Sequence, residues 1–474
     1  MTEEQSVDDY NNGALGRLLA PGIKLILIKG APGTGKTSLA TKLLELVRSG
    51  TYISTRVGLE KLAKQSARLR AMDKGGRLQR VSLESRKVDL EDMRLGTAAL
   101  AMQQVIAASL AKKELIVLDS WDTIAKEVDR TERLRMEKTI AAIVDEGASR
   151  AIFISEEPEL TSTDYLVDAI VTLTRSDLEA RRLREIAWEK IRGQAAPARR
   201  SLFTLDEGRF VLIPPPFISP PDPQGLRKPP LSRTRERFEV IPHTSTRLST
   251  GSRDLDEFLG GGLTRGMSIL LEKGPTVGND WIAPLVSSVQ ANVLLDGGSC
   301  IAVPPMVVSS RSLLEGTQAL VGDEVTRSRM RIMSYAATTF KHPSIVDLSR
   351  AKRGETYQLQ QDTATKVKQE EAPTLWVLSI DTYETYADPE RGATASYFAR
   401  GSQARRETGD VGILIANPNA GSLQTLSNNC DVHLMLEEKD GALLLYSKRP
   451  PSDLYSVNYD YSKGYPRVSL KQMV

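Results

Sequence analysis

Short apolar runs alternate with longer amphipathic stretches along the whole chain, and this pattern predicts buried strands separated by helices. The runs that predict strands cover residues 24–28, 150–155 and 168–173 in the first half and residues 375–380, 411–416 and 431–436 in the second half. A strand that is apolar along its length has to be covered on both faces, which is typical of a parallel sheet between helices. The predicted fold class is therefore α/β, with two tandem domains that each contain a mainly parallel sheet flanked by helices.

A proline-rich segment separates the two halves. Eight prolines lie between residues 214 and 230, and five arginine or lysine residues lie between residues 227 and 237. Prolines at this density disfavour helix and suit an extended spacer, so we interpret the cations as part of a solvated linker rather than a binding patch. The sequence predicts a first domain over residues 1–213, a basic proline-rich linker over 214–242 and a second domain over 243–474.

The two halves resemble each other weakly. Residues 21–30 of the first half are similar to residues 265–274 of the second half. Each of these segments is followed by a glycine-containing loop, a helical stretch and, further on, a strand that ends in aspartate. This similarity indicates that the two predicted domains share one fold.

Composition narrows the choice of function classes. The chain has 474 residues with 26% charged and 40% hydrophobic residues, as expected of an ordinary globular protein. A net charge of +3 is too small to indicate nucleic-acid binding by itself. The two cysteines and three scattered histidines indicate neither a disulfide framework nor a zinc site. The polar N-terminus and the lack of a membrane-spanning apolar run predict a cytoplasmic protein with no membrane partner.

Residues 30–37 read Gly-Ala-Pro-Gly-Thr-Gly-Lys-Thr and match the motif G-x-x-x-x-G-K-[ST] at each fixed position. The motif lies between a predicted strand and a predicted helix, as a phosphate-binding loop requires. Lys36 would reach the outermost phosphates, and the Thr37 hydroxyl would take a position on Mg²⁺. The sequence therefore predicts a nucleoside triphosphate site. The predicted binding residues are Gly30, Gly33, Thr34, Gly35, Lys36, Thr37 and Ser38.

A second nucleotide signal lies at residues 114–119, an apolar run that ends in Asp119. A carboxylate at the end of a buried strand, well downstream of the phosphate-binding loop, is what a Mg²⁺-positioning aspartate requires. We therefore assign Asp119 to the Mg²⁺ site together with Thr37.

These segments together resemble the KaiC-like branch of the RecA superfamily. The resemblance is carried by the Asp119–Ser120 strand end, by the order of the later strands and by the segment 182–193. It implies ATP as the nucleotide. It also implies that Lys190 and Arg192 reach the nucleotide of a neighbouring subunit as catalytic cations, and hence a homo-oligomer, in a ring. The alternative is that both are surface cations on a strand.

One position departs from that branch. The strand after the phosphate-loop helix normally ends in a glutamate that activates water, and Arg56 stands there instead. Glu60, one helical turn further on, is a candidate replacement with a catalytic role, and Glu156 and Glu157 are two others. Because a positioned base contributes ~10²–10⁴-fold, we predict tight ATP binding with slow hydrolysis. Arg56 is either a γ-phosphate sensor or a structural surface arginine.

Residues 52–57 with residues 60–62 resemble the GvpD family of archaeal gas-vesicle regulators, and the resemblance extends over residues 14–213. It implies a P-loop regulator that acts on a transcriptional activator. The expected partner is therefore a regulatory protein whose binding depends on the nucleotide state.

The second half retains the framework of the first but lacks its nucleotide chemistry. Residues 250–263 are very similar to the segment that opens KaiC-like domains, yet the loop at 274–281 has no lysine and carries Asp280. A negative charge there would repel phosphates. We predict a degenerate P-loop domain, in which Asp381 is a structural relic and Lys448 and Arg449 correspond to the cations of the first half. His433, between apolar neighbours, is interpreted as a hydrogen-bonded strand residue.

Two other function classes remain as alternatives. A DNA-dependent ATPase of recombination or repair, similar to RecA and RadA, would need a basic groove with aromatic residues, but aromatic residues make up only 5% of the chain. The arginine pairs at 181–182, 199–200 and 405–406 provide some positive charge. The third class is a scaffold that uses ATP only as a structural ligand.

Overall fold

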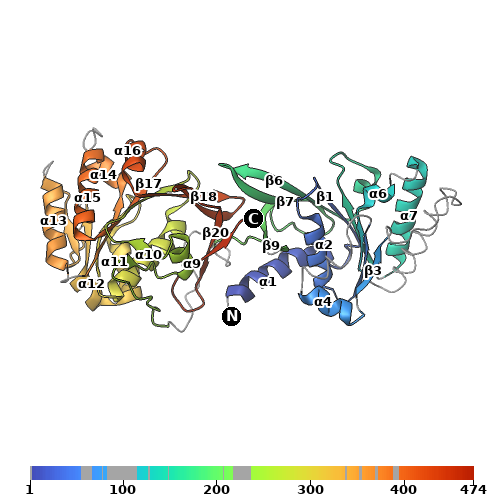
Figure 1. The fold of residues 1–474 in the computed structure, drawn as a ribbon, viewed down its shortest axis with the longest axis horizontal. Helices are drawn as coiled ribbons and strands as arrows, with labels where there is room; N and C mark the ends of the chain where they lie inside the picture. Colours follow the sequence, from blue (N-terminus) through green and yellow to red (C-terminus); the bar gives the residue numbers. More distant parts are fainter. Residues whose placement is uncertain are drawn as a thin grey trace. The chain divides into compact units, whose positions relative to one another are not determined.

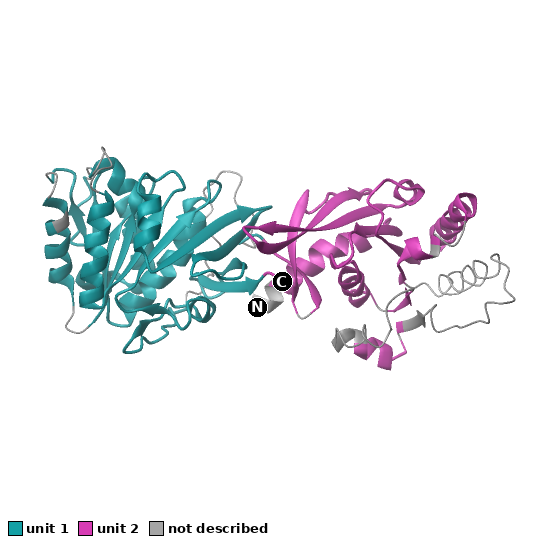
Figure 2. Cartoon of the chain, turned by 45° about the horizontal axis from the view of Figure 1, so that its top comes forward, with its two compact units in different colours: residues 1–2, 215–472 teal, residues 3–214, 473–474 magenta. Residues whose placement is uncertain are grey.

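The computed structural model describes residues 3–47, 49–54, 67–76, 78–82, 115–125, 129–147, 149–206, 208–216, 236–336, 339–351, 355–368, 372–387 and 394–474. The chain divides into two compact units (Figure 2). The N-terminal unit contains Glu3–Pro214 with Met473–Val474, and the C-terminal unit contains Pro215–Gln472. None of the described helices is both long enough and apolar enough to cross a bilayer.

The N-terminal unit is built on a nine-stranded sheet in the order β3-β2-β4-β5-β1-β6-β7-β8-β9 (Figure 1). The strands from β3 to β6 pair in parallel, and β7, β8 and β9 continue the sheet in antiparallel fashion. Their bounds are β1 Leu25–Gly30, β2 Gly50–Ser54, β3 Leu78–Ser82, β4 Leu115–Asp119, β5 Arg150–Ser155, β6 Ala169–Leu178, β7 Arg181–Ile191, β8 Arg200–Asp206 and β9 Arg209–Leu212.

Helices cover both faces of this sheet because alternate side chains of its strands point to opposite faces. Ile26 and Ile28 of β1 pack with the apolar side of α2, whereas Leu25 and Leu27 pack in a second core with α6 and α7. The described helices of the unit are α1 Glu3–Gly16, the short 3₁₀ helix η1 Arg17–Leu19, α2 Lys36–Glu45, α4 Ala67–Lys74, α6 Trp121–Ala125, α7 Arg130–Glu146 and α8 Ser162–Leu166.

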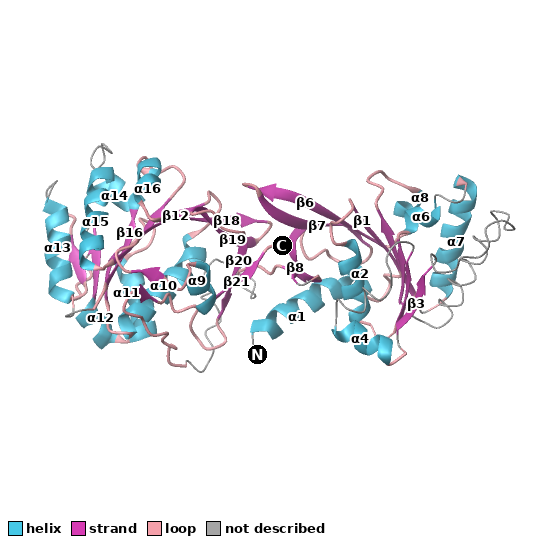
Figure 3. Ribbon diagram, in the orientation of Figure 1, coloured by secondary structure: helices cyan, strands magenta, loops and turns pink. Residues whose placement is uncertain are grey.

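The C-terminal unit contains a ten-stranded sheet in the order β15-β14-β13-β16-β17-β12-β18-β19-β20-β21, with helices over it (Figure 3). The strands are β12 Ser268–Lys273, β13 Ser299–Val303, β14 Met330–Ser334, β15 Ile345–Asp347, β16 Thr374–Ser379, β17 Val411–Ala416, β18 Val432–Lys439, β19 Ala442–Arg449, β20 Tyr455–Asp460 and β21 Arg467–Gln472. The helices are α9 Arg253–Phe258, α10 Asn279–Leu295, α11 Ser310–Val321, α12 Asp323–Arg329, α13 Glu355–Val367, α14 Ile380–Tyr386, α15 Thr394–Thr408 and α16 Leu423–Asn429. A short ribbon of β10 Arg247–Leu248 and β11 Leu263–Thr264 precedes the sheet.

The two sheets follow the same path. The strands β12, β13 and β14 correspond to β1, β2 and β3, and the strands β16 to β21 correspond to β4 to β9. With this correspondence the order of nine strands is the same in both sheets, and β15 is an additional strand at one edge. In both sheets the last three strands are antiparallel. The predicted fold class, two α/β domains with mainly parallel sheets between helices, is confirmed.

Candidate nucleotide-binding site

The phosphate-binding loop begins where β1 ends, and its glycines are required by its shape. A Cβ atom on Gly30 would lie 2.4 Å from the main-chain oxygen of Leu173, so no side chain fits there. Gly33 and Gly35 have φ angles of +74° and +106°, a left-handed conformation that favours glycine. Gly35 is also the N-cap of α2. The loop therefore leads into a helix N-terminus, where main-chain N–H groups suit an anion.

Lys36, the first residue of α2, turns back over the loop. Its Nζ donates to the carbonyl oxygens of Gly30 at 2.7 Å and Ala31 at 2.9 Å, and lies 3.8 Å from Oε1 of Glu156. The Thr34 hydroxyl donates to the same Ala31 oxygen at 2.8 Å. The side chain of Lys36 is 7% exposed. The ammonium group therefore lies beside the first two residues of the loop, and phosphate oxygens could replace their carbonyl oxygens as its acceptors.

The two residues predicted for Mg²⁺ meet in the structure. Asp119 ends β4, and its Oδ2 accepts a hydrogen bond of 2.8 Å from the Thr37 hydroxyl. Oxygen donors of a carboxylate and a hydroxyl are ligands that Mg²⁺ prefers, so the pair fits this ion. The buried Tyr52 hydroxyl of β2 donates to the same carboxylate oxygen. Burial and the Asp119 charge raise the pKa of Tyr52 well above its ordinary value, so Tyr52 stays a donor.

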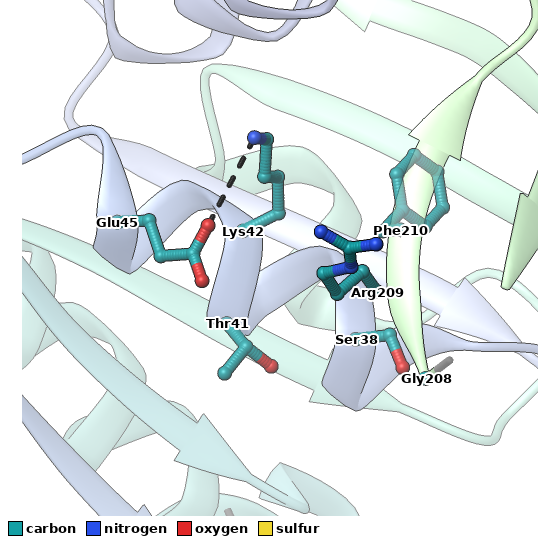
Figure 4. Close-up of a pocket in the computed structure, with 7 residues that line it drawn as sticks. All are labelled: Ser38, Thr41, Lys42, Glu45, Gly208, Arg209 and Phe210. Atoms are coloured by element: carbon teal, nitrogen blue, oxygen red, sulfur yellow. Dashed lines mark ion pairs between the residues drawn. The ribbon is translucent and has the colours of Figure 1, made fainter. Parts of the chain in front are cut away.

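Ser38, the last of the predicted binding residues, lies in an open pocket beside the loop. The pocket is small and lies between one side of α2 and the turn from β8 to β9 (Figure 4). On the α2 side of the pocket, an ion pair of 3.9 Å joins Lys42 to Glu45. Its lining residues are Ser38, Thr41, Lys42, Glu45, Gly208, Arg209 and Phe210.

Both predicted trans-acting cations make contacts within their own unit. Lys190 Nζ donates to the carbonyl oxygen of Asp164 at 3.3 Å, and Arg192 forms an ion pair of 2.9 Å with Asp168. The Arg192 side chain is nevertheless 61% exposed. The described structure therefore places these two cations beside the α8 region and not at the phosphate-binding loop of their own chain.

Two contacts at the loop were not anticipated from the sequence. The guanidinium of Arg184, in β7, donates to the carbonyl oxygen of Gly33 at 3.0 Å. Burial lowers the pKa of Arg184, and the nearby Arg182 and Arg175 lower it further. The other contact is that of Tyr52 with Asp119. Nothing in the local pattern distinguishes Arg184 or Tyr52 from other strand residues, because both contacts depend on the pairing of distant strands.

The structure describes two of the three carboxylates considered as replacements for the missing base. The third, Glu60, lies outside the described residues, as does Arg56. Glu156, by contrast, follows β5 directly and lies next to Lys36, whereas the main-chain N–H of Glu157 donates to Ser155 Oγ at 3.1 Å. Of the carboxylates considered, Glu156 is therefore the one that the described structure brings to the lysine.

The corresponding loop of the C-terminal unit is built differently. Its lysine, Lys273, precedes the loop and donates to the Asn279 side chain at 3.1 Å, and Asp280 lies in the first turn of α10. Asp381 lies in the first turn of α14 and accepts from the Asn417 main chain at 3.4 Å. Burial raises the pKa of Asp381 above its ordinary range. The loop does not reproduce the lysine and hydroxyl arrangement of the N-terminal unit.

Charged residues near the end of β12 bind one another. His433 Nε2 lies 2.9 Å and Lys448 Nζ 3.1 Å from Oε2 of Glu272, and Ser427 Oγ lies 2.9 Å from His433 Nδ1. The hydrogen bond with His433 lowers the pKa of Glu272 more than burial raises it, and Lys448 adds to this effect. Arg449 donates to the carbonyl oxygens of Ser427 and Cys430. The prediction that His433 is hydrogen-bonded within its sheet agrees with this geometry.

Comparison with known proteins finds one family model and two relatives that this chain is similar to. Residues 20–189 match the family model described as "GvpD gas vesicle protein, P-loop domain". Protein GvpD2 of Halobacterium salinarum is 27% identical over 96% of this chain and 94% of its own length. Protein GvpD1 of the same organism is 24% identical over 95% of this chain and 94% of its own. The similarity to these two proteins thus extends well beyond the P-loop domain.

Proposed function

We propose that this chain, which is similar to GvpD proteins, is an ATP-binding regulatory protein whose nucleotide state controls a protein partner, a transcription regulator. The observation that carries the proposal is the convergence of Lys36 and the Thr37–Asp119 pair at one edge of the sheet. β1 and β4 both flank β5 in a parallel arrangement, so their carboxyl ends lie at the same edge.

The chemistry of the site follows from these groups. When a nucleotide binds, the Lys36 ammonium group would give up its carbonyl acceptors and donate to oxygens of the outer phosphates. The main-chain N–H groups at the start of α2 would also donate to phosphate oxygens. Thr37 and Asp119 are the residues that would hold Mg²⁺, which supplies charge neutralisation to the phosphates when bound.

Slow hydrolysis and oligomerisation are further parts of this proposal. A regulatory state has to persist long enough for a partner to respond, and slow hydrolysis of ATP would provide that time. In an oligomer, Lys190 and Arg192 would act on the nucleotide of a neighbouring subunit. The 61% exposure of the Arg192 side chain leaves it accessible to such a neighbour.

The test is ATP binding and turnover by the full chain, compared with Lys36→Ala. We expect Lys36→Ala to weaken Mg²⁺–ATP binding by about 10- to 100-fold, because a hydrogen bond to a charged group contributes about 1.5–3 kcal/mol. Lys138→Ala, which removes an exposed lysine of α7, is the matched control and should bind as wild type does. The mass of the oligomer is recorded in ATP and in ADP.

The same assay separates the alternatives. Equal binding by wild type and Lys36→Ala would contradict the proposal. Fast turnover that rises with single-stranded DNA and falls steeply with salt would favour the DNA-dependent ATPase instead. ATP binding with no turnover, with or without a partner, would favour the scaffold.

A further inference from the structure

Glu156 stands at the outer end of the predicted phosphate site. It follows β5, which pairs with β1 in parallel, so it lies at the same edge of the sheet as the phosphate-binding loop. Its Oε1 is 3.8 Å from Lys36 Nζ, with the Glu156 side chain 27% exposed. Since the P-loop lysine reaches the outermost phosphates, a carboxylate beside its ammonium group lies at the γ-phosphate end.

The main chain of Glu156 is anchored, whereas its carboxylate reaches toward the loop. The Glu156 N–H donates to one carboxylate oxygen of Asp122, and the Ser155 hydroxyl donates to the other at 3.0 Å. Asp122 lies in α6, which directly follows the Asp119 strand end. The position of Glu156 is therefore tied to the same segment that carries the Mg²⁺ residue.

A nucleotide has to change the Lys36–Glu156 contact. When the ammonium group binds phosphate, it gives up part of its interaction with Glu156, and a γ-phosphate brings negative charge toward the same carboxylate. A diphosphate ends one phosphate earlier and leaves this end of the site without that charge. Repulsion from Glu156 therefore acts on the triphosphate more than on the diphosphate.

We propose that Glu156 is the residue by which the site discriminates between ATP and ADP. Its carboxylate holds Lys36 when no γ-phosphate is present and is turned away from Lys36 when the γ-phosphate enters. This inference rests on the proposed function, because it needs a nucleotide in the N-terminal unit, and it adds the residue that makes the site sensitive to nucleotide state.

The consequence of this discrimination lies in the segment that follows. The segment from Glu156 to the end of α8 carries two exposed apolar side chains, Leu160 at 73% and Tyr165 at 74% exposure. Lys29 of β1 holds the segment through the Glu159 carbonyl oxygen at 2.8 Å and Asp164 at 2.9 Å. A change at Glu156 therefore occurs at one end of a short segment whose other end is fixed.

The experiment measures affinity rather than turnover. Purified full chain is titrated with ADP and with the non-hydrolysable ATP analogue AMP-PNP, both with Mg²⁺, for wild type and for Glu156→Gln, which keeps the shape and removes the charge. We expect Glu156→Gln to bind AMP-PNP about tenfold more tightly while its ADP affinity changes by about twofold or less. Glu159→Gln, which changes an exposed carboxylate and keeps the main-chain contact with Lys29, is the matched control and should leave the ratio of the two affinities at the wild-type value.

Each outcome has a separate meaning. If wild type binds neither nucleotide, or binds them independently of Lys36, the proposed function fails. If wild type binds both in a Lys36-dependent manner and Glu156→Gln leaves their affinity ratio unchanged, or raises both equally, the role of Glu156 is overturned while the proposed function stands. An unchanged far-ultraviolet circular dichroism spectrum and melting temperature show that the variant is folded.

Discussion

At the scale of single residues, the site depends on which groups share the Asp119 carboxylate. Its Oδ2 accepts hydrogen bonds from Thr37, next to the P-loop lysine, and from Tyr52 of the neighbouring strand. Tyr52 is 2% exposed, so its hydroxyl has little access to water as an alternative partner. Two donors on one oxygen hold the carboxylate toward the loop before any cation arrives.

Removal of one of these donors should be measurable. We expect Tyr52→Phe to lower the free energy of unfolding by about 1–2 kcal/mol, because a buried hydrogen bond to a charged group is lost. Mg²⁺–ATP should then raise the melting temperature of the variant more than that of wild type, since the cation replaces the missing positive partner. Tyr165→Phe, which alters an exposed tyrosine, is the control. Equal melting temperatures for Tyr52→Phe and wild type would contradict the role of Tyr52.

At the scale of elements, α8 is joined to β1 by a buried ion pair. Lys29 Nζ lies 2.9 Å from Asp164 Oδ1, and the two side chains are 6% and 3% exposed. The other Asp164 oxygen accepts from the main chain and the hydroxyl of Thr161, which caps the helix. Burial raises the pKa of Asp164, but the hydrogen bonds from Thr161 and Lys29 outweigh it, and the pKa is lowered.

This pair gives a pH-dependent prediction. A group whose pKa is lowered on folding stabilises the folded state above its unfolded pKa and loses that effect as the pH falls through the lowered value. Asp164→Asn should cost on the order of 3 kcal/mol at pH 7, since it leaves the Lys29 charge buried without a partner. The difference in melting temperature between wild type and variant should stay constant above about pH 5 and narrow below about pH 4. A difference that grows toward low pH would contradict this assignment, and Asp177→Asn, an exposed strand carboxylate, is the control.

The elements themselves could be predicted far better than the contacts between them. Apolar runs locate β1, β5 and β6 because burial on both faces leaves a local signal, and the P-loop spacing locates the start of α2. The Tyr52–Asp119 and Arg184–Gly33 contacts join residues that are 67 and 151 positions apart. Such contacts depend on strand order, which no local pattern encodes. Glu156 was one of several candidates until the pairing of β5 with β1 placed it beside Lys36.

At the scale of the whole molecule, two sheets of the same strand order carry unlike loops. The loop after β1 has Lys36 at the start of its helix, whereas the lysine before the second loop, Lys273, donates to Asn279. Asp280 adds a negative charge where phosphates would enter. The chain therefore combines one loop suited to phosphate with one that opposes it.

This asymmetry predicts the number of nucleotides that the chain binds. We expect calorimetric titration with Mg²⁺–ATP to give one site per chain. Lys36→Ala should remove that site, whereas Lys273→Ala should leave both stoichiometry and affinity at wild-type values. Two equivalents of nucleotide in wild type, or a full equivalent retained by Lys36→Ala, would show that the second loop binds nucleotide after all.

The shared order of nine strands also has an evolutionary consequence. Two copies of one topology in a single chain are the expected product of an internal gene duplication, in which both halves began with the same loop. Once one copy supplies the phosphate chemistry, selection no longer maintains the other loop, and substitutions such as Asp280 can be fixed there. The second copy is then free to change its surface while the first preserves its ligand. Descendants of such a duplication can keep one chemistry and diverge in the proteins that they recognise.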